Sequence, residues 1–120
     1  MKVVTVSRVP AEPAGGTLFT GPVTRQALIA GEDSKQFIVS QVNFSQGVRN
    51  KFHTHSNDQV LIVTGGKGIC ATETEEVTVS AGDVILFPAG EKHWHGATKD
   101  SSFSHIFITG VGHKTTQVEK

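Results

Sequence analysis

The sequence is poor in several features that define large classes of proteins. Cys70 is the only cysteine among 120 residues, so no disulfide can form within the chain, and a reducing cytoplasmic location is expected. No apolar stretch approaches the roughly 18 residues of a membrane-spanning helix. The first residues, MKVVTVSRVP, also lack the apolar core of a signal peptide. These absences predict a soluble protein of the cytoplasm.

An excess of charge of either sign is missing as well. Eleven lysines and arginines balance eleven aspartates and glutamates, which gives a formal net charge of zero. Because no basic surface or acidic tail is indicated, neither nucleic acid nor an anionic membrane is an expected partner. A low net charge also weakens repulsion between copies, and we expect a homodimer that binds a small molecule.

A helical period is absent throughout, whereas short runs of β-branched and aromatic residues recur between turn signals. This pattern predicts an all-β barrel or double-sheet jelly roll, formed by residues 1–120 as a single domain. We expect an N-terminal arm at 1–21 and a polar, frayed tail at 113–120. Strands are expected at residues 2–6, 23–30, 35–44, 59–64, 69–74, 77–80, 84–87, 93–97 and 103–109, with a glycine-rich turn at 65–68.

The segment GVRNKFHTHSNDQVLIVTG, residues 47–65, concentrates the side chains that suggest chemistry. Alternate residues of a strand point to the same side, so His53 and His55 should project together. Gln59 begins the next predicted strand, and the turn between the strands would direct its amide oxygen toward the imidazoles. A second segment, GDVILFPAGEKHWH, passes from a strand through a Pro-Ala-Gly turn to His93. We therefore predict a metal site formed by His53, His55, Gln59 and His93.

Three imidazoles and one amide oxygen suit a divalent transition metal, and the absence of cysteine from the set argues against iron–sulfur chemistry. Four protein ligands leave about two positions open on a six-coordinate ion, as catalysis requires. Because Gln59 is neutral where a carboxylate would cancel one charge, the site should attract anions and polarise a bound oxygen strongly. Two alternatives are histidines that share this spacing by chance and a decayed site in which Gln59 weakens metal binding.

The two segments resemble the paired motifs of the cupin superfamily. The first motif, with its usual glutamate replaced by glutamine, is matched by Gly47, His53, His55, Gln59 and Gly65. The second is matched by Gly82, Pro88, Gly90 and His93, with Ala97 where an asparagine is frequent. The run GEKHWHGATKDSSFSHIFI is similar to small cupins with glutamine as the fourth ligand. This subgroup includes bacterial manganese-dependent hydroxynitrile lyases and cupins associated with carboxymuconolactone decarboxylase. The resemblance implies a cupin jelly roll that holds Mn or Fe, with Zn or Ni as alternatives.

His105 is the candidate catalytic residue. In the similar lyases a histidine at this strand position acts as a general base beside the metal, which implies that role here. By alternation His105 shares a face with Phe103 and Phe107, and apolar surroundings would keep its imidazole neutral near pH 7. The alternative is a core histidine bonded to the backbone.

Other polar and aromatic side chains receive weaker interpretations. His95 is expected at the barrel rim, with support of a metal ligand as its alternative. Lys51 is expected to be solvated, although a regular strand would let it reach an anion in the barrel mouth. Trp94 and Cys70 are interpreted as packing residues, and His113, in the tail, is given no role.

Together these features predict a metal-dependent enzyme that acts on a small carbonyl- or carboxylate-containing molecule. The resemblance favours a lyase similar to hydroxynitrile lyase. A cupin dioxygenase is the alternative enzyme, and a non-catalytic protein that binds a small molecule through the metal is the alternative class.

Overall fold

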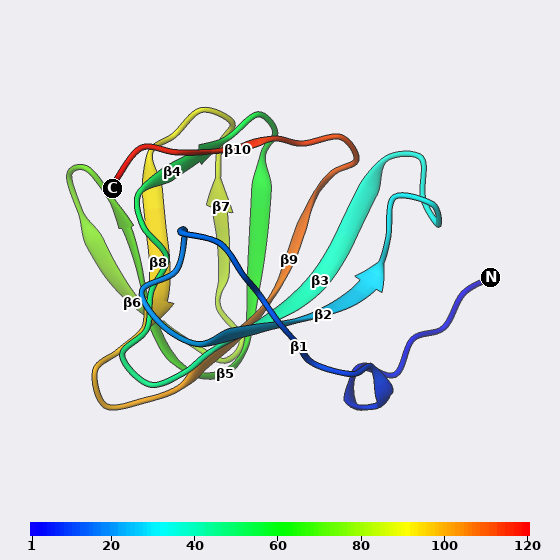
Figure 1. Cartoon of the computed structure of the whole chain (residues 1–120), viewed down its shortest axis with the longest axis horizontal. Coiled ribbons are helices and arrows are strands. Elements are labelled where there is room, and N and C mark those ends of the chain that lie inside the picture. Colours follow the sequence, from blue (N-terminus) through cyan, green and yellow to red (C-terminus); the bar gives the residue numbers. More distant parts are fainter.

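The computed structural model describes all 120 residues, which form strands almost throughout (Figure 1). A single turn of 3₁₀ helix, η1 (Val6–Arg8), precedes ten strands. The strands are β1 (Glu12–Pro13), β2 (Val23–Ile29), β3 (Phe37–Phe44), β4 (His53–His55), β5 (Gln59–Thr72), β6 (Glu76–Ser80), β7 (Val84–Phe87), β8 (His93–Ala97), β9 (Phe103–Gly110) and β10 (Thr115–Gln117). The chain contains no helix with the length and apolar character needed to cross a lipid bilayer.

The strands form two antiparallel sheets that share β5. The first half of β5 pairs with β7 and β9, and β9 leads through β3 and β2 to β1. The second half pairs with β6 and β8, and β8 leads through β4 to β10. Figure 1 shows β4, β7 and β8 on one side of a curled sheet whose other side is the curved β2, β3 and β9. The predicted all-β jelly roll is confirmed.

Strand β5 corrects the prediction of a turn at residues 65–68. The strand runs unbroken for 14 residues and bends there, with a shift of register between Val63 and Gly65. Gly66 has a φ of 70°, and a side chain at this position would collide with the carbonyl group of Ser102. At Gly68 a Cβ atom would lie 2.5 Å from the ring of Phe103. The glycines therefore permit close packing inside a bent strand instead of reversing the chain.

The N-terminal arm contains no strand at residues 2–6, so that prediction is wrong. The segment instead runs through η1 to the short strand β1, which pairs with β2. The amide of Gln26 on β2 donates hydrogen bonds to the carbonyl oxygens of Val6 and Val9, at 3.0 and 2.9 Å. Hydrogen bonds from a side chain of the barrel therefore hold the arm in place of the expected backbone pairing between strands.

The C-terminal tail also differs from its prediction, because residues 115–117 are not frayed. They form β10, which pairs with β4 so that Thr115 lies opposite His55 and Gln117 lies opposite His53. In Figure 1 this last strand crosses the top of the barrel over β4. The tail thus borders the segment with the candidate ligands.

Side chains from both sheets fill the interior. Every second residue of β9 points inward, and Phe103 is fully buried together with Leu61 of β5. Burial of each such side chain stabilises the fold by about 1.5–3 kcal/mol. The interior also contains five histidines that are at most 9% exposed. Buried polar groups normally have hydrogen-bond partners. The partners of these imidazoles therefore indicate which ring nitrogens are free to bind a ligand.

Candidate metal centre and cavity

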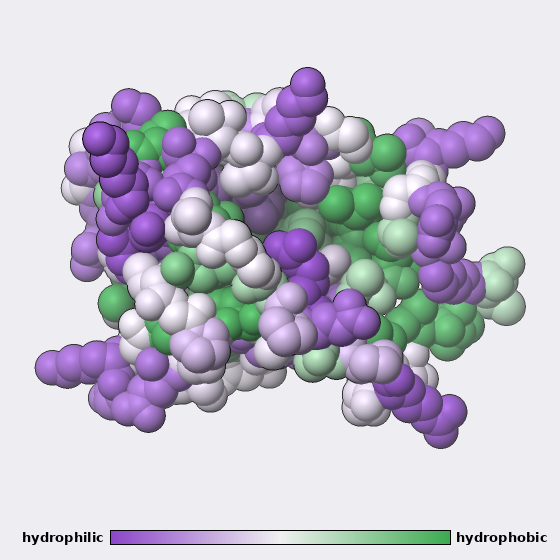
Figure 2. Space-filling view, viewed as in Figure 1, coloured by the Kyte–Doolittle hydropathy of each residue, from purple (hydrophilic) through white to green (hydrophobic).

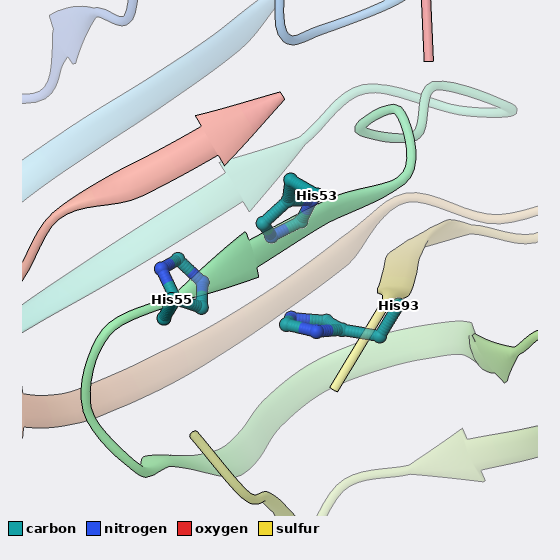
Figure 3. Close-up of side chains that lie close together, drawn as sticks. All are labelled: His53, His55 and His93. Atoms are coloured by element: carbon teal, nitrogen blue, oxygen red, sulfur yellow. The ribbon is translucent and has the colours of Figure 1, made fainter. Parts of the chain in front are cut away.

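Strand β4 and the start of β8 bring three histidines together. His53 and His55 lie on the same side of β4, and His93 is paired with His53 across the β4–β8 ladder. Figure 3 shows the three rings gathered in the space between these strands. Their potential ligand atoms all lie within 4.8 Å of one another, and the three residues are 1, 9 and 1% exposed. The structure thus assembles the predicted imidazole cluster.

The Nδ1 atom of each ring in the cluster has a partner of its own. His53 Nδ1 donates to the Lys51 carbonyl oxygen at 2.6 Å, and His93 Nδ1 donates to the Glu91 carbonyl oxygen at 2.9 Å. His55 Nδ1 lies 3.0 Å from the Thr115 hydroxyl oxygen. A carbonyl accepts but cannot donate, so His53 and His93 carry their proton on Nδ1 and leave Nε2 with a free lone pair. Such bonds orient imidazoles for metal binding.

Three other potential metal-ligand atoms of the predicted site are buried and have no hydrogen-bond partner. Nε2 of His55, Nε2 of His93 and Oε1 of Gln59 are all inaccessible to solvent and form no hydrogen bond. Gln59 is 5% exposed and begins β5, opposite Phe87 of β7. An unpaired buried polar atom costs roughly 1–3 kcal/mol, and a cation bound by these three atoms would remove that cost.

Burial also controls the charge of the cluster. It lowers the pKa of His55 to about 3 and that of His93 to about 4, and it lowers the pKa of His53 as well. The neighbouring imidazoles add to the shifts of His55 and His93, because protonation of one ring disfavours protonation of the next. The cluster is therefore neutral near pH 7, with its lone pairs available to a metal.

His105 lies in the interior beside this cluster, on β9. It is 1% exposed, and neither of its ring nitrogens has a hydrogen-bond partner of good geometry, although the backbone of Ile106 lies close to the ring. Its ring packs against Phe103 and Phe44, with centroids 5.5 and 5.8 Å away. Burial lowers the pKa of His105 to about 4; the nearby Ile106 backbone opposes this shift, and the charge of Arg25 adds to it. The imidazole is neutral and unbonded at neutral pH.

His95 is not at the barrel rim, so that interpretation is wrong. It is 3% exposed, and its ring stands nearly perpendicular to that of His105, with centroids 4.9 Å apart. Asn50 holds it on both sides: the amide nitrogen donates to His95 Nε2 at 3.2 Å, and the amide oxygen accepts from the His95 backbone at 2.8 Å. His95 shares strand parity with buried His93, which is a signal for an inward position, and the contact with Asn50 depends on the fold.

A cavity opens onto these side chains. Its volume is about 60 Å³, and it is open to solvent on one side. Figure 2 shows the molecule hollowed near the middle of this face, where hydrophilic and apolar surfaces meet. Its lining includes no aspartate or glutamate and comprises Leu18, Phe19, Arg25, Val42, Phe44, Asn50, His53, His55, Gln59, His95, His105, Phe107, His113 and Thr115.

Several of these lining residues were not singled out from the sequence. His113 was given no role, yet it lies in the lining with its ring 5.8 Å from that of His55. Leu18 and Phe19 come from the N-terminal arm, and Arg25 comes from β2. For Arg25 the signal was present, since it shares strand parity with buried Val23. The other three depend on how distant segments fold together.

The C-terminal segment supports the cluster from outside. Besides the contact of Thr115 with His55, the Glu119 carboxylate accepts from the backbone N–H of Phe52 at 2.8 Å and pairs with Arg49 at 2.7 Å. The guanidinium of Arg49 lies 4.6 Å from the centroid of the Trp94 ring. These contacts attach the chain end to the segment that leads into β4.

The donor set fits a divalent transition metal. It offers imidazole nitrogens that are neutral and already oriented, plus one amide oxygen, and it contains no thiolate. Such mixed nitrogen and oxygen ligands suit Mn, Fe, Ni or Zn. The buried histidine cluster can therefore bind a metal ion.

Comparison with known proteins agrees with this architecture. Residues 40–109 match the cupin domain family Cupin_2, a segment that contains both motifs and His105. The chain belongs to the Cupin_2 family. This cupin is 36% identical over 107 residues to an (R)-mandelonitrile lyase of Granulicella tundricola, a match that covers 86% of the chain and 82% of the lyase.

Two further comparisons bear on this cupin. It is 38% identical over 68 residues to an acireductone dioxygenase of a Picosynechococcus species, but it covers only 39% of that protein. The crystal structure of a cupin-like protein from Thermotoga maritima superimposes with a TM-score of 0.86 at 29% identity, covering 94% of this cupin and 89% of that chain. Lyase and dioxygenase therefore both occur among the relatives of this cupin.

Two residues considered from the sequence lie outside the cavity of the cupin. Lys51 precedes β4 and is not part of the lining, and its contribution is the carbonyl oxygen that accepts from His53. Trp94 is also absent from the lining and stacks with Arg49. Cys70 is buried in the apolar core, where burial raises the pKa of its thiol to about 12.

Proposed function

We propose that this cupin is a metal-dependent lyase that acts on a small hydroxynitrile or a related carbonyl compound. One observation carries the proposal: buried, unpartnered ring nitrogens of His55 and His93 lie beside His53, and the unpartnered Gln59 Oε1 belongs to a residue that lines the same cavity as His53 and His55. A single cation would give all of them a partner. The similarity to a mandelonitrile lyase over most of both chains supports the reaction class.

We assign His53, His55, Gln59 and His93 as the ligands. A divalent metal bound there, Mn or Fe in preference to Zn or Ni, would supply Lewis acidity toward a substrate oxygen. All four ligands are neutral, so none of them cancels the charge of the ion, and an oxyanion is stabilised more strongly than it would be with a glutamate at position 59.

His105 is the proposed general base. Its neutral ring can accept the proton of a substrate hydroxyl, because neither nitrogen is engaged in a hydrogen bond. As this proton leaves, a carbonyl forms and the bond to the nitrile carbon breaks, with the bonding electrons leaving on cyanide. His105 then returns the proton to cyanide, which departs as hydrogen cyanide. Phe44 and Phe103 surround the ring and exclude water from this transfer.

An oxygen-dependent reaction is the second candidate, and the match to acireductone dioxygenases favours it. The same four residues would hold a redox-active metal. A protein that only binds a small molecule at the metal would need no base, so an unbonded, neutral His105 favours an enzyme over this third possibility.

Two assays on one preparation separate these candidates. Metal content is measured first, and cleavage of (R)-mandelonitrile is followed as benzaldehyde formation in the metal-loaded, chelated and reloaded protein. Oxygen uptake with an enediol substrate is the parallel assay. We expect nitrile cleavage that disappears on chelation and returns on reloading. A metal-loaded protein that is inactive in both assays would instead be a binding protein.

The variant Gln59→Glu tests the charge argument. It should retain the metal yet lower turnover, because an added carboxylate reduces the field at the bound oxygen. Gln36→Glu is the matched control, since it adds the same charge at an exposed position outside the cavity. Equal turnover in Gln59→Glu and wild type would remove neutral ligation from the proposed mechanism.

A further inference from the structure

Arg25 is the one arginine in the cavity lining, and its position follows from a single row across the sheet. In the ladders Arg25 pairs with Val42, Val42 pairs with His105, and His105 pairs with Val63. Paired residues of adjacent strands point to the same face, so Arg25 and His105 lie on the interior face, one strand apart. His105 is fully buried, whereas Arg25 is exposed to solvent at the cavity mouth.

The side chain of Arg25 extends over the interior. Its guanidinium carbon is 5.9 Å from the centroid of the Phe107 ring, and Phe107 lies on the inward face of β9 two residues from His105. The charge of Arg25 also contributes to the low pKa of both His105 and His113. A guanidinium within electrostatic reach of two cavity histidines is within reach of a molecule bound among them.

This guanidinium has no anionic partner in the protein. Arg25 takes part in none of the three ion pairs of the chain and in no side-chain hydrogen bond. Glu12 is opposite Arg25 in the β1–β2 ladder, but no oxygen of its carboxylate comes within 4.0 Å of an Arg25 nitrogen. By contrast, Arg49 is fully engaged with Glu119, Asn50 and Trp94. Arg25 therefore keeps its five donors available to a ligand.

We propose that Arg25 forms an anion-binding subsite and that the substrate or product of this cupin carries a carboxylate. The inference rests on the proposed function, because it places the carboxylate at the cavity mouth while another oxygen of the same molecule occupies the metal centre. A planar guanidinium binds a carboxylate through two parallel hydrogen bonds. The lining offers no negative charge that would repel such a ligand.

The test compares mandelate with its neutral analogue mandelamide, both as ligands of the purified 120-residue protein loaded with metal. Isothermal titration calorimetry measures each dissociation constant in wild type and in Arg25→Gln, Arg25→Lys and Arg8→Gln. Arg8 is the matched control, because it is an exposed arginine on η1 outside the cavity. We expect Arg25→Gln to weaken mandelate binding about 10- to 100-fold, as loss of a charge-assisted pair does. Arg25→Lys should weaken it less, and mandelamide should bind all four proteins alike.

Repeating the titrations after chelation distinguishes this inference from the proposed function. If the metal assignment is wrong but Arg25 binds carboxylates, wild type still prefers mandelate to mandelamide without metal, and Arg25→Gln abolishes the preference. If the metal assignment is right but the subsite is not, the metal ion alone makes wild type prefer mandelate, and Arg25→Gln changes neither dissociation constant. That second result overturns the inference. Should a variant fail to fold, chelated wild type that binds mandelate and mandelamide equally overturns it as well.

Discussion

His53 and His105 are equally buried, yet they differ in how their rings are held. Both residues are 1% exposed, and they come from different sheets of the barrel. His53 donates a 2.6 Å hydrogen bond to a carbonyl oxygen, His93 Nδ1 donates to another carbonyl oxygen, and His55 Nδ1 is bonded to the Thr115 hydroxyl. The ring of His105 is held only by packing against aromatic groups. Imidazoles oriented by hydrogen bonds are suited to hold a metal ion. An imidazole with both nitrogens unbonded is suited to accept and return a proton.

The largest effect should come from acid, which acts on both kinds of histidine at once. The pKa of His93 and of His105 falls from 6.5 to about 4 on folding, so between these values the unfolded chain binds protons that the folded chain does not. The free energy of unfolding of the metal-free protein should therefore decrease as pH falls from about 6.5 to about 4. These two residues together contribute on the order of several kcal/mol.

Urea unfolding at several pH values measures this loss. Metal-loaded protein should be more stable at pH 7 and lose stability more steeply, because protons compete with the metal for the cluster but not for His105. A metal-free protein with equal stability at pH 6.5 and pH 4.5 would contradict the neutral, buried state of these imidazoles.

A pair of alanine variants should separate the fixed from the unbonded histidine. His93→Ala should lose bound metal and with it activity, because it removes a proposed ligand and leaves the Glu91 carbonyl without its donor. His105→Ala should retain the metal and lose turnover by about 100-fold or more, as expected for removal of a general base. Metal content per chain and nitrile cleavage are measured on the same samples.

The control for the second variant is Ser104→Ala, which alters the neighbouring position of β9 without entering the cavity. Loss of metal in His105→Ala would mean that His105 is a ligand and not a base. Full activity in that variant would leave the reaction without the proposed proton acceptor.

What could be predicted from the sequence was local in the chain. The shared orientation of His53 and His55 follows from strand alternation alone, and the inward direction of His105 follows from its parity with Phe103 and Phe107. The jelly roll was predicted because the strand and turn signals agree over most of the chain. The homodimer expected for a small cupin stays a prediction, and low net charge points only to self-association.

What could not be predicted depends on which segments meet. Parity with Val23 gives Arg25 an inward direction, but the neighbours that it meets follow from the order of β2, β3 and β9, which no pattern within residues 23–30 indicates. The glycines at 65–68 look like a turn because their sequence does not show that the Phe103 ring will pack against position 68. The tail HKTTQVEK has no apolar alternation, and it becomes a strand only because β4 offers it an edge.

A substitution in this C-terminal tail should have the smallest effect. It tests whether the hydrogen bond that orients the His55 ring contributes to metal affinity. Thr115 Oγ1 is the only partner of His55 Nδ1, so Thr115→Val, which keeps the shape of the side chain, should leave His55 free to turn. Loss of such a supporting contact lowers metal affinity by about 10- to 100-fold. Competition with a chromogenic chelator measures the affinity, and Thr116→Val, at the next position of β10, is the control. Equal affinity in the two variants would show that pairing of β10 with β4 positions His55 without the hydroxyl. Restoration of wild-type affinity by Thr115→Ser, against a deficit in Thr115→Val, would assign the effect to the hydrogen bond itself.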